Sequence, residues 1–235
     1  MAYVNSTIAD NVASGDVVIS VPAGVVDGHD LIMFVVSFTN TAPGAVTGWT
    51  QVGAQITVGT TYRGQFYQRV ASSEPASYTL VVASFPSAIA AMHAYSSATE
   101  VVEHDDQQAG SITNILQNTS ATSDQSLTAH TQLAAGRVMY VEMGETGQSA
   151  NSSDYTFTDD SHVALRQYRK VAFGSNSVYL RTFDELLIPQ ASEPARTFQV
   201  LQSTTQFGGI TVSHFASRLV FAAESGPTGD SWGWA

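Results

Sequence analysis

The densest cluster of side chains that could do chemistry is His104-Asp105-Asp106, with Glu100 and Glu103 just before it. Carboxylate oxygens are the ligands that hard divalent cations prefer, so this cluster could hold a cation. The ligand spacing of a calcium-binding loop is absent, however. We therefore expect a solvated acidic loop and no cofactor, with His104, Asp105 and Asp106 as the candidates for a metal site.

A second cluster, Asp159-Asp160-Ser161-His162, contains the residue types of a hydrolase triad. Triad members are brought together by the fold rather than by adjacency in sequence, and the chain has no Gly-x-Ser-x-Gly motif. This segment is typical of a turn. Neither this cluster nor the first predicts a catalytic residue, and we expect a protein that is not an enzyme.

Two histidines, His93 and His214, stand shortly before the aromatic residues Tyr95 and Phe215 in apolar segments. Their places look equivalent in the two halves of the chain described below. We expect two core or edge histidines that pack in the same way. A paired ligand site or a pH switch is the alternative interpretation.

Composition excludes several classes of protein. The 235 residues have a formal net charge of −11, which disfavours binding to nucleic acid because phosphate backbones are repelled. There is no cysteine, so disulfides and cysteine-ligated zinc are excluded. The apolar run Leu31 to Val36 is too short to span a membrane, and the amino terminus lacks the pattern of a secretory signal. We expect synthesis in a host cytoplasm.

The chain contains an internal repeat. Three phrases recur, the first two at an offset of 106 residues and the third at 119: Met33-Phe34-Val35 as Met139-Tyr140-Val141, Gly48-Trp49-Thr50 as Asp154-Tyr155-Thr156, and Ser73-Glu74-Pro75-Ala76 as Ser192-Glu193-Pro194-Ala195. An insertion of about 13 residues in the second copy reconciles the two offsets. The repeat decides the domain organisation.

Short segments rich in Val, Ile, Tyr, Phe and Thr, separated by Gly, Pro, Asn and Ser, predict strands throughout. In the first copy the expected strands are Val17 to Val21, Leu31 to Phe38, Gln65 to Val70, Tyr78 to Ala83 and Ile89 to Tyr95. In the second copy they are Ser126 to Thr131, Val138 to Met143, Val163 to Val171, Val178 to Leu187, Thr197 to Leu201 and Gly209 to Phe215. We expect a long connection from Val101 to Ser126.

About five strands with one apolar face cannot bury that face alone, so we expect the two copies to pack face to face. The fold class is predicted to be all-β with almost no helix, as a two-sheet jelly-roll-like sandwich built from pseudo-repeats at about 10–100 and 120–216. One sandwich would span 1–218, followed by a flexible arm at 219–235. Two tandem small sandwiches, divided near Glu100 to Ser120, are the alternative.

Several motifs resemble a known family. They are Gly15 to Val25, Gly28 with Asp30-Leu31-Ile32, Gly48-Trp49-Thr50, Tyr67 to Ala71, and Glu74 to Thr79. In this order they resemble a β-sandwich family of phage virion surface proteins, which includes capsid decoration and tail or fibre proteins, with related modules in bacterial extracellular proteins. The resemblance covers residues 10–100, and 120–216 less closely. It implies a fold and no catalytic residue.

The resemblance implies a structural virion protein. We expect a capsid decoration or cement protein on the phage particle surface that binds the major capsid protein or other virion proteins as a homo-oligomer, for instance a trimer. One alternative is a tail fibre or receptor-binding sandwich that contacts host glycans through Trp49, Tyr62 and Tyr67. Another is a bacterial carbohydrate-binding module or lyase-like enzyme.

The end of the sequence, Glu224 to Ala235, holds two of the three tryptophans, Trp232 and Trp234. Such a composition does not fold by itself, and exposed tryptophans favour burial against a partner. Trp232 and Trp234 are therefore candidate anchors on a neighbouring subunit. An arm that folds back on its own sandwich is the alternative.

Overall fold

The structure is a computed structural model that describes residues 2–11, 15–38, 43–58, 62–80, 88–96, 99–108, 121–127, 130–132, 136–146, 155–158, 163–173, 176–187, 190–193, 196–202 and 214–223. Side chains are described in 2–11, 15–38, 43–57, 62–80, 88–96, 137–144, 163–172 and 178–186. In this described part every element is a strand, and the all-β fold is confirmed. No helix within it has the length and apolar character needed to cross a membrane.

The first half of the chain has strands whose pairing is nested. They are β1 (Tyr3–Asn11), β2 (Val17–Ser20), β3 (Asp30–Ser37), β4 (Thr50–Val58), β5 (Tyr62–Val70), β6 (Ser77–Leu80) and β7 (Ala88–Tyr95). Strand β1 pairs with β7, β2 with β6 and β3 with β5, while β4 adds to β5. Pairing of first with last wraps the chain as in a jelly roll. The products are inner sheet 1, in the order β1-β7-β3-β5-β4, and the outer ribbon β2-β6.

The second half repeats this wrapping. Its strands are β8 (Thr99–Gln108), β9 (Ala121–Leu127), β10 (His130–Gln132), β11 (Gly136–Thr146), β12 (Tyr155–Thr158), β13 (Ala164–Phe173), β14 (Asn176–Leu187), β15 (Gln190–Glu193), β16 (Arg196–Gln202) and β17 (His214–Ala223). Strand β8 pairs with β17, β9 with β16, β10 with β15 and β11 with β14. Inner sheet 2 has the order β8-β17-β11-β14-β13, which matches inner sheet 1 strand for strand. The internal repeat is therefore a repeat of topology.

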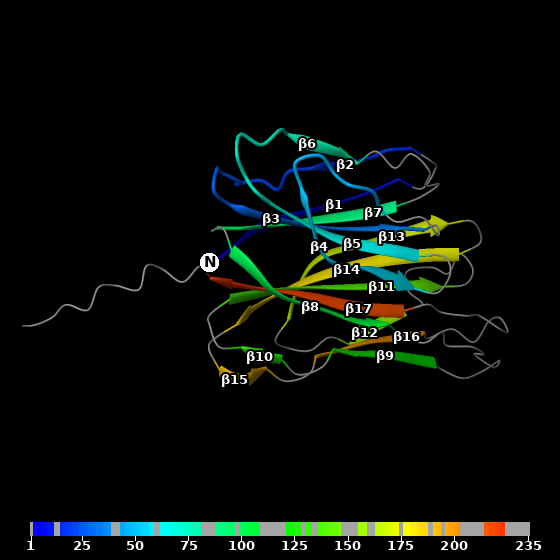
Figure 1. Cartoon of the computed structure of the whole chain (residues 1–235). Coiled ribbons are helices and arrows are strands. Elements are labelled where there is room, and N and C mark those ends of the chain that lie inside the picture. Colours follow the sequence, from blue (N-terminus) through cyan, green and yellow to red (C-terminus); the bar gives the residue numbers. More distant parts are fainter. Residues whose placement is uncertain are drawn as a thin grey trace, which may run out of the picture.

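The molecule has four layers, which follow one another from top to bottom in Figure 1. The ribbon β2-β6 covers inner sheet 1, inner sheet 2 lies beneath it, and the outer sheet β12-β16-β9 lies beneath that. The two inner sheets thus form the central sandwich that the sequence predicts. The two outer layers are additional to that prediction.

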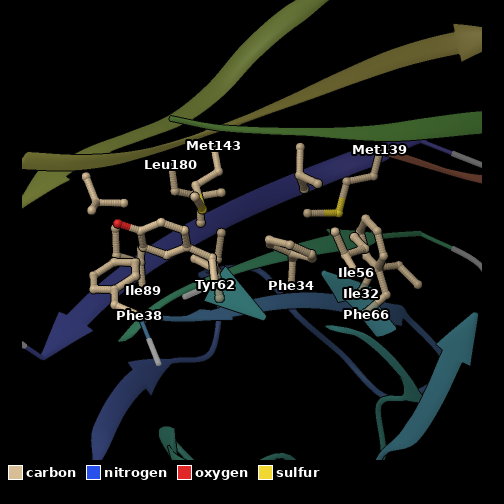
Figure 2. Packing of buried hydrophobic residues seen from close by; sticks show 14 of the residues in the cluster. Ile32, Phe34, Phe38, Ile56, Tyr62, Phe66, Ile89, Met139, Met143 and Leu180 are labelled. Carbon is tan, nitrogen blue, oxygen red and sulfur yellow. The ribbon is translucent and has the colours of Figure 1, made fainter. Parts of the chain in front are cut away.

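The central core lies between the two inner sheets. Figure 2 shows Met139, Met143 and Leu180 of inner sheet 2 pointing toward Phe34 and Phe66 of inner sheet 1. All five side chains are fully buried, and the rings of Phe34 and Phe66 lie 4.8 Å apart. Since the face-to-face packing joins residues from both copies, each copy completes the core of the other.

A second core lies on the other face of inner sheet 1, under the ribbon β2-β6. It takes Leu31, Met33 and Val35 from β3, whereas Ile32, Phe34 and Val36 of the same strand face the central core. Met139 faces the central core, so Met33 and Met139 lie on opposite faces although the sequence aligns them. Because a one-residue shift in a strand reverses its faces, the offset of 106 residues is not the structural register.

The structure corrects several predicted boundaries. The expected connection from Val101 to Ser126 contains β8 and most of β9. The strand expected at Gly209 to Phe215 is β17, whose described bounds are His214–Ala223, so residue 218 lies inside a strand and not at the start of an arm. Strands β1, β4, β12 and β15 were not predicted. The strand expected at Ser126 to Thr131 has the wrong bounds, because it overlaps the end of β9 and the start of β10. The other predicted strands are found, within a few residues at their ends.

Candidate functional site

The most extensive group of described polar side chains lies where β1 and β7 meet β13 and β14, and we call it the seam. From β13, the Gln167 amide donates to the Ser6 backbone oxygen at 2.9 Å and to Ser6 Oγ at 2.8 Å. The Arg166 guanidinium lies 3.9 Å from the centre of the Tyr3 ring, a cation–π contact. Strand β1 is thereby held to the second half of the chain.

Asp184 is the buried anion of the seam. Its Oδ2 accepts hydrogen bonds from Arg137 at 2.5 Å and from Arg166 at 3.1 Å, while Oδ1 has no hydrogen-bond partner within the described part. Burial raises the pKa of the Asp184 carboxyl, and the two arginines oppose this rise. Removing either arginine would leave this buried charge with only one of its two cationic partners.

His93 lies at the centre of the seam and is fully buried. Its Nδ1 is 3.1 Å from the Tyr95 hydroxyl and its Nε2 is 2.7 Å from Thr182 Oγ1, on the facing sheet. Burial, with a smaller contribution from the Arg166 charge, lowers the pKa of His93 to about 3. The ring is therefore neutral near pH 7 and acts as a hydrogen-bonded link between the sheets.

The pairing of His93 with His214 is wrong. His93 stands two residues before the end of β7, opposite Ile32 of β3. His214 is the first described residue of β17 and stands opposite Gly144 of β11. The two histidines occupy different places in equivalent strands, so the symmetric ligand site is not formed. The side chain of His214 lies outside the described residues.

The acidic cluster is in a strand and not in a loop. His104, Asp105 and Asp106 belong to β8, where they pair with Leu219, Arg218 and Ser217 of β17. Their side chains lie outside the described part, as do all atoms of Asp159, Asp160, Ser161, His162, Trp232 and Trp234. Within the described part, no group of three or more His, Asp or Glu side chains could hold a metal ion.

Trp49, Tyr62 and Tyr67, the candidates for glycan stacking, are all buried. Tyr62 belongs to the central core and contacts the Phe38 ring edge-to-face, with centroids 5.9 Å apart. Tyr67 belongs to the outer core and donates to the Gly44 carbonyl at 2.7 Å, and burial raises its pKa to about 12. None of the three rings forms an exposed platform.

Three of the motifs that carry the family resemblance meet around Glu74: Gly48-Trp49-Thr50, Tyr67 to Ala71 and Glu74 to Thr79. Its Oε1 accepts from Arg69 and from the Ser72 backbone, both at 2.8 Å, and its Oε2 accepts from the Tyr78 hydroxyl. The Tyr78 ring in turn packs edge-to-face against Trp49, 5.3 Å away. These residues thus fix the turn before β6.

A further charged cluster, which the sequence analysis missed, lies on the outward face of inner sheet 2. Arg181 donates to Glu142 Oε2 at 2.9 Å, and the Tyr140 hydroxyl donates to Glu185 Oε2 at 2.7 Å. All four side chains are buried. The equivalent face of inner sheet 1 carries the apolar outer core, with Gln65 and Arg69 beside Tyr67 on β5.

One signal for the seam was present in the sequence. Three of the nine basic residues, Arg166, Arg169 and Lys170, lie within β13. Such a concentration in a predicted strand suggests an acidic partner. The partners Asp184 and Asp10 come from separate strands, and only the fold brings them together.

Comparisons of the chain with protein-family models, curated proteins and solved structures found no match. The family resemblance therefore remains a prediction from the quoted motifs. The geometry is our guide to function. It describes a buried polar seam that holds two repeats together, a structural motif around Glu74 and a second buried charge cluster.

Proposed function

We propose that this chain is a structural protein of a phage particle, a capsid decoration or cement protein that binds the outer capsid surface and stabilises the head. The observation that carries the proposal is how the described chemistry-bearing side chains are used. His93, Asp184 and Glu74 all make contacts that hold strands or turns together. Side chains that hold strands and turns together suit a protein with a structural role.

The architecture also supports this proposal. Two jelly-roll-like repeats share one central core, so a force applied to either repeat is resisted by the whole molecule. Only 12% of the residues are charged, which suits a surface that packs against other proteins. The partners proposed are the major capsid protein and further copies of this chain.

The glycan-binding alternative has less support. A receptor-binding sandwich needs aromatic rings on its surface, and Trp49, Tyr62 and Tyr67 are buried. The carbohydrate-binding module or lyase-like enzyme draws on the same aromatic residues or on carboxylates. The described buried carboxylates are bonded to glutamine, arginine or tyrosine: Asp30, Asp184, Glu142 and Glu185.

The test is the copy number in purified phage particles that carry this gene, measured by quantitative mass spectrometry against the major capsid protein. A decoration protein is expected in hundreds of copies, and particles from a deletion strain should lose their genome at a lower temperature. Tens of copies located in the tail would refute the proposal. Deletion particles whose heads keep the same number of proteins and the same heat stability would also refute it.

A further inference from the structure

Strand β13 forms one edge of inner sheet 2. Among the described strands it pairs with β14 alone, so the backbone groups of every second residue point away from the sheet and meet no other described strand. Leu165, Tyr168 and Arg169 are exposed along this edge. A ten-residue edge of this kind is a template on which a strand of another molecule can pair.

The residues of β13 give this edge a positive charge. Arg166, Arg169 and Lys170 are three of the nine basic residues of the chain, and the strand has no acidic residue. Arg166 is held at Asp184 inside the seam. Arg169 is half exposed and donates to Asp10 through Nε, which leaves its two terminal nitrogens without a hydrogen bond in the described part. In a chain with a net charge of −11, such an edge attracts an acidic strand.

The opposite edge of the same sheet, β8, is acidic. It holds four of the twenty acidic residues of the chain: Glu100, Glu103, Asp105 and Asp106. Like β13 it has ten residues, and among the described strands it pairs with β17 alone. The edges of inner sheet 1, β1 and β4, hold one charged residue, Asp10. Of the described edges of the two inner sheets, β8 is therefore the one whose charge matches β13.

The two edges cannot meet within one molecule. Strands β14, β11 and β17 lie between β13 and β8, so four strand spacings, about 19 Å, separate them. Two β13 strands from different copies would place like charges together, as would two β8 strands, and like charges in paired positions are destabilising. The strand of this chain that fits β13 is therefore β8 of another copy.

We propose that β13 of one copy pairs with β8 of a second copy, which continues inner sheet 2 from molecule to molecule. Four antiparallel pairings separate β13 from β8 in the sheet, so the two strands run in the same direction. Copies that stand side by side in the same orientation thus pair them in parallel. The contact is head-to-tail, and it closes into a ring if the rotation allows. The inference rests on the proposed function, because it supplies the contact between copies on the particle.

The test follows association of full-length chains by analytical ultracentrifugation. One variant, Lys170→Glu, reverses a charge on β13, and the other, Asp105→Lys with Asp106→Lys, reverses charges on β8. Each variant alone brings like charges together and should associate about tenfold more weakly than the natural chain. An equimolar mixture should recover association, because the natural β13 of one variant meets the natural β8 of the other.

The matched control is Asp16→Lys, which reverses an exposed charge outside both edges and should leave association unchanged. Circular dichroism establishes that each variant is folded. A natural chain that stays monomeric would overturn the proposal, and so would variants that associate as the control does. A mixture that associates no better than its two components would also overturn it.

A second measurement needs no substitution. Hydrogen exchange of the natural chain is compared at low and high protein concentration, and association should slow exchange in β8 and β13 but not in β2 of the outer ribbon. Associated chains in which β8 and β13 exchange as fast as in the monomer would refute the pairing. None of these results alters the copy number in phage particles, which tests the proposed function separately.

Discussion

At the scale of single residues, the contacts of His93 and Asp184 explain how these two polar side chains can be buried. The His93 ring bridges two sheets through Tyr95 and Thr182, and Asp184 is compensated by Arg137 and Arg166. Buried groups of this kind are tolerated because they are hydrogen-bonded. Burial shifts the pKa values of both groups, as it does in structural ion-pair networks and in active sites alike.

His93 should make the protein sensitive to acid. Its pKa is lower in the folded protein than in the unfolded chain, so the unfolded chain binds the proton first. Stability is therefore full above about pH 6.5 and falls as the pH drops toward 3, by up to about 5 kcal/mol. The ring is surrounded by Arg166, Asp184, Tyr3 and Tyr95. These residues are left unchanged when the natural chain is compared with a His93 variant.

The measurement is the free energy of unfolding in urea from pH 3.5 to 7.5, for the natural chain and for His93→Asn. The difference between the two should be largest near neutral pH and shrink on acidification. A difference that is independent of pH would show that protonation of His93 does not affect the free energy of unfolding.

Glu74 should contribute more to the free energy of unfolding than an ordinary surface carboxylate does. Glu74→Ala leaves Arg69, the Ser72 amide and the Tyr78 hydroxyl without their acceptor, and should reduce the free energy of unfolding by about 2 to 3 kcal/mol. Asp16→Ala removes an exposed carboxylate of the same repeat and serves as the control. Equal effects of the two substitutions in urea denaturation would contradict this role.

At the scale of elements, the strands that the sequence reveals are the central ones. The wholly buried strands β3 and β7 are nearly continuous apolar runs, so composition alone finds them. Strand β8 reads Thr-Glu-Val-Val-Glu-His-Asp-Asp-Gln-Gln, which is typical of a solvated loop, and becomes a strand through its pairing with β17. Edge strands such as β1 and β8 were not predicted, because they form strands only by pairing with segments that are distant in the sequence.

The contacts of the seam could not be predicted from the sequence either, although the basic residues of β13 were visible in it. Gln167 and Ser6 are 161 residues apart, and Arg137 and Asp184 are 47 apart. No local spacing links them. The turn motif around Glu74 was visible, in contrast, because Arg69, Glu74 and Tyr78 lie within one short stretch, although its hydrogen bonds were not foreseen.

The contact between β1 and β13 can be measured by a double-mutant cycle on Ser6→Ala and Gln167→Ala. The side-chain hydrogen bond between them predicts a coupling free energy of about 1 kcal/mol. Thr7→Ala, whose hydroxyl donates to the Ser20 carbonyl instead, should show no coupling with Gln167→Ala. A zero coupling would mean that the Ser6 hydroxyl does not help to hold β1 to β13.

At the scale of the whole molecule, the repeat explains the architecture. The nested pairing of each half builds a five-stranded sheet, and its own outer layer covers the outward face of that sheet. The inward face is apolar in both halves. This inward face is buried only when it packs against the sheet of the other half. The face-to-face packing was predicted from this need, whereas the outer layers and the true register between the copies required the structure.

The most direct test of this account is to separate the halves. Chains 1–97 and 98–235, produced alone, would each expose the central core, including Phe34 on one and Met139 on the other. Each is expected to aggregate or self-associate, and refolding them together should give a 1:1 complex with the far-ultraviolet circular dichroism of the intact chain. Two halves that are folded, monomeric and without affinity for each other in sedimentation would contradict the shared core.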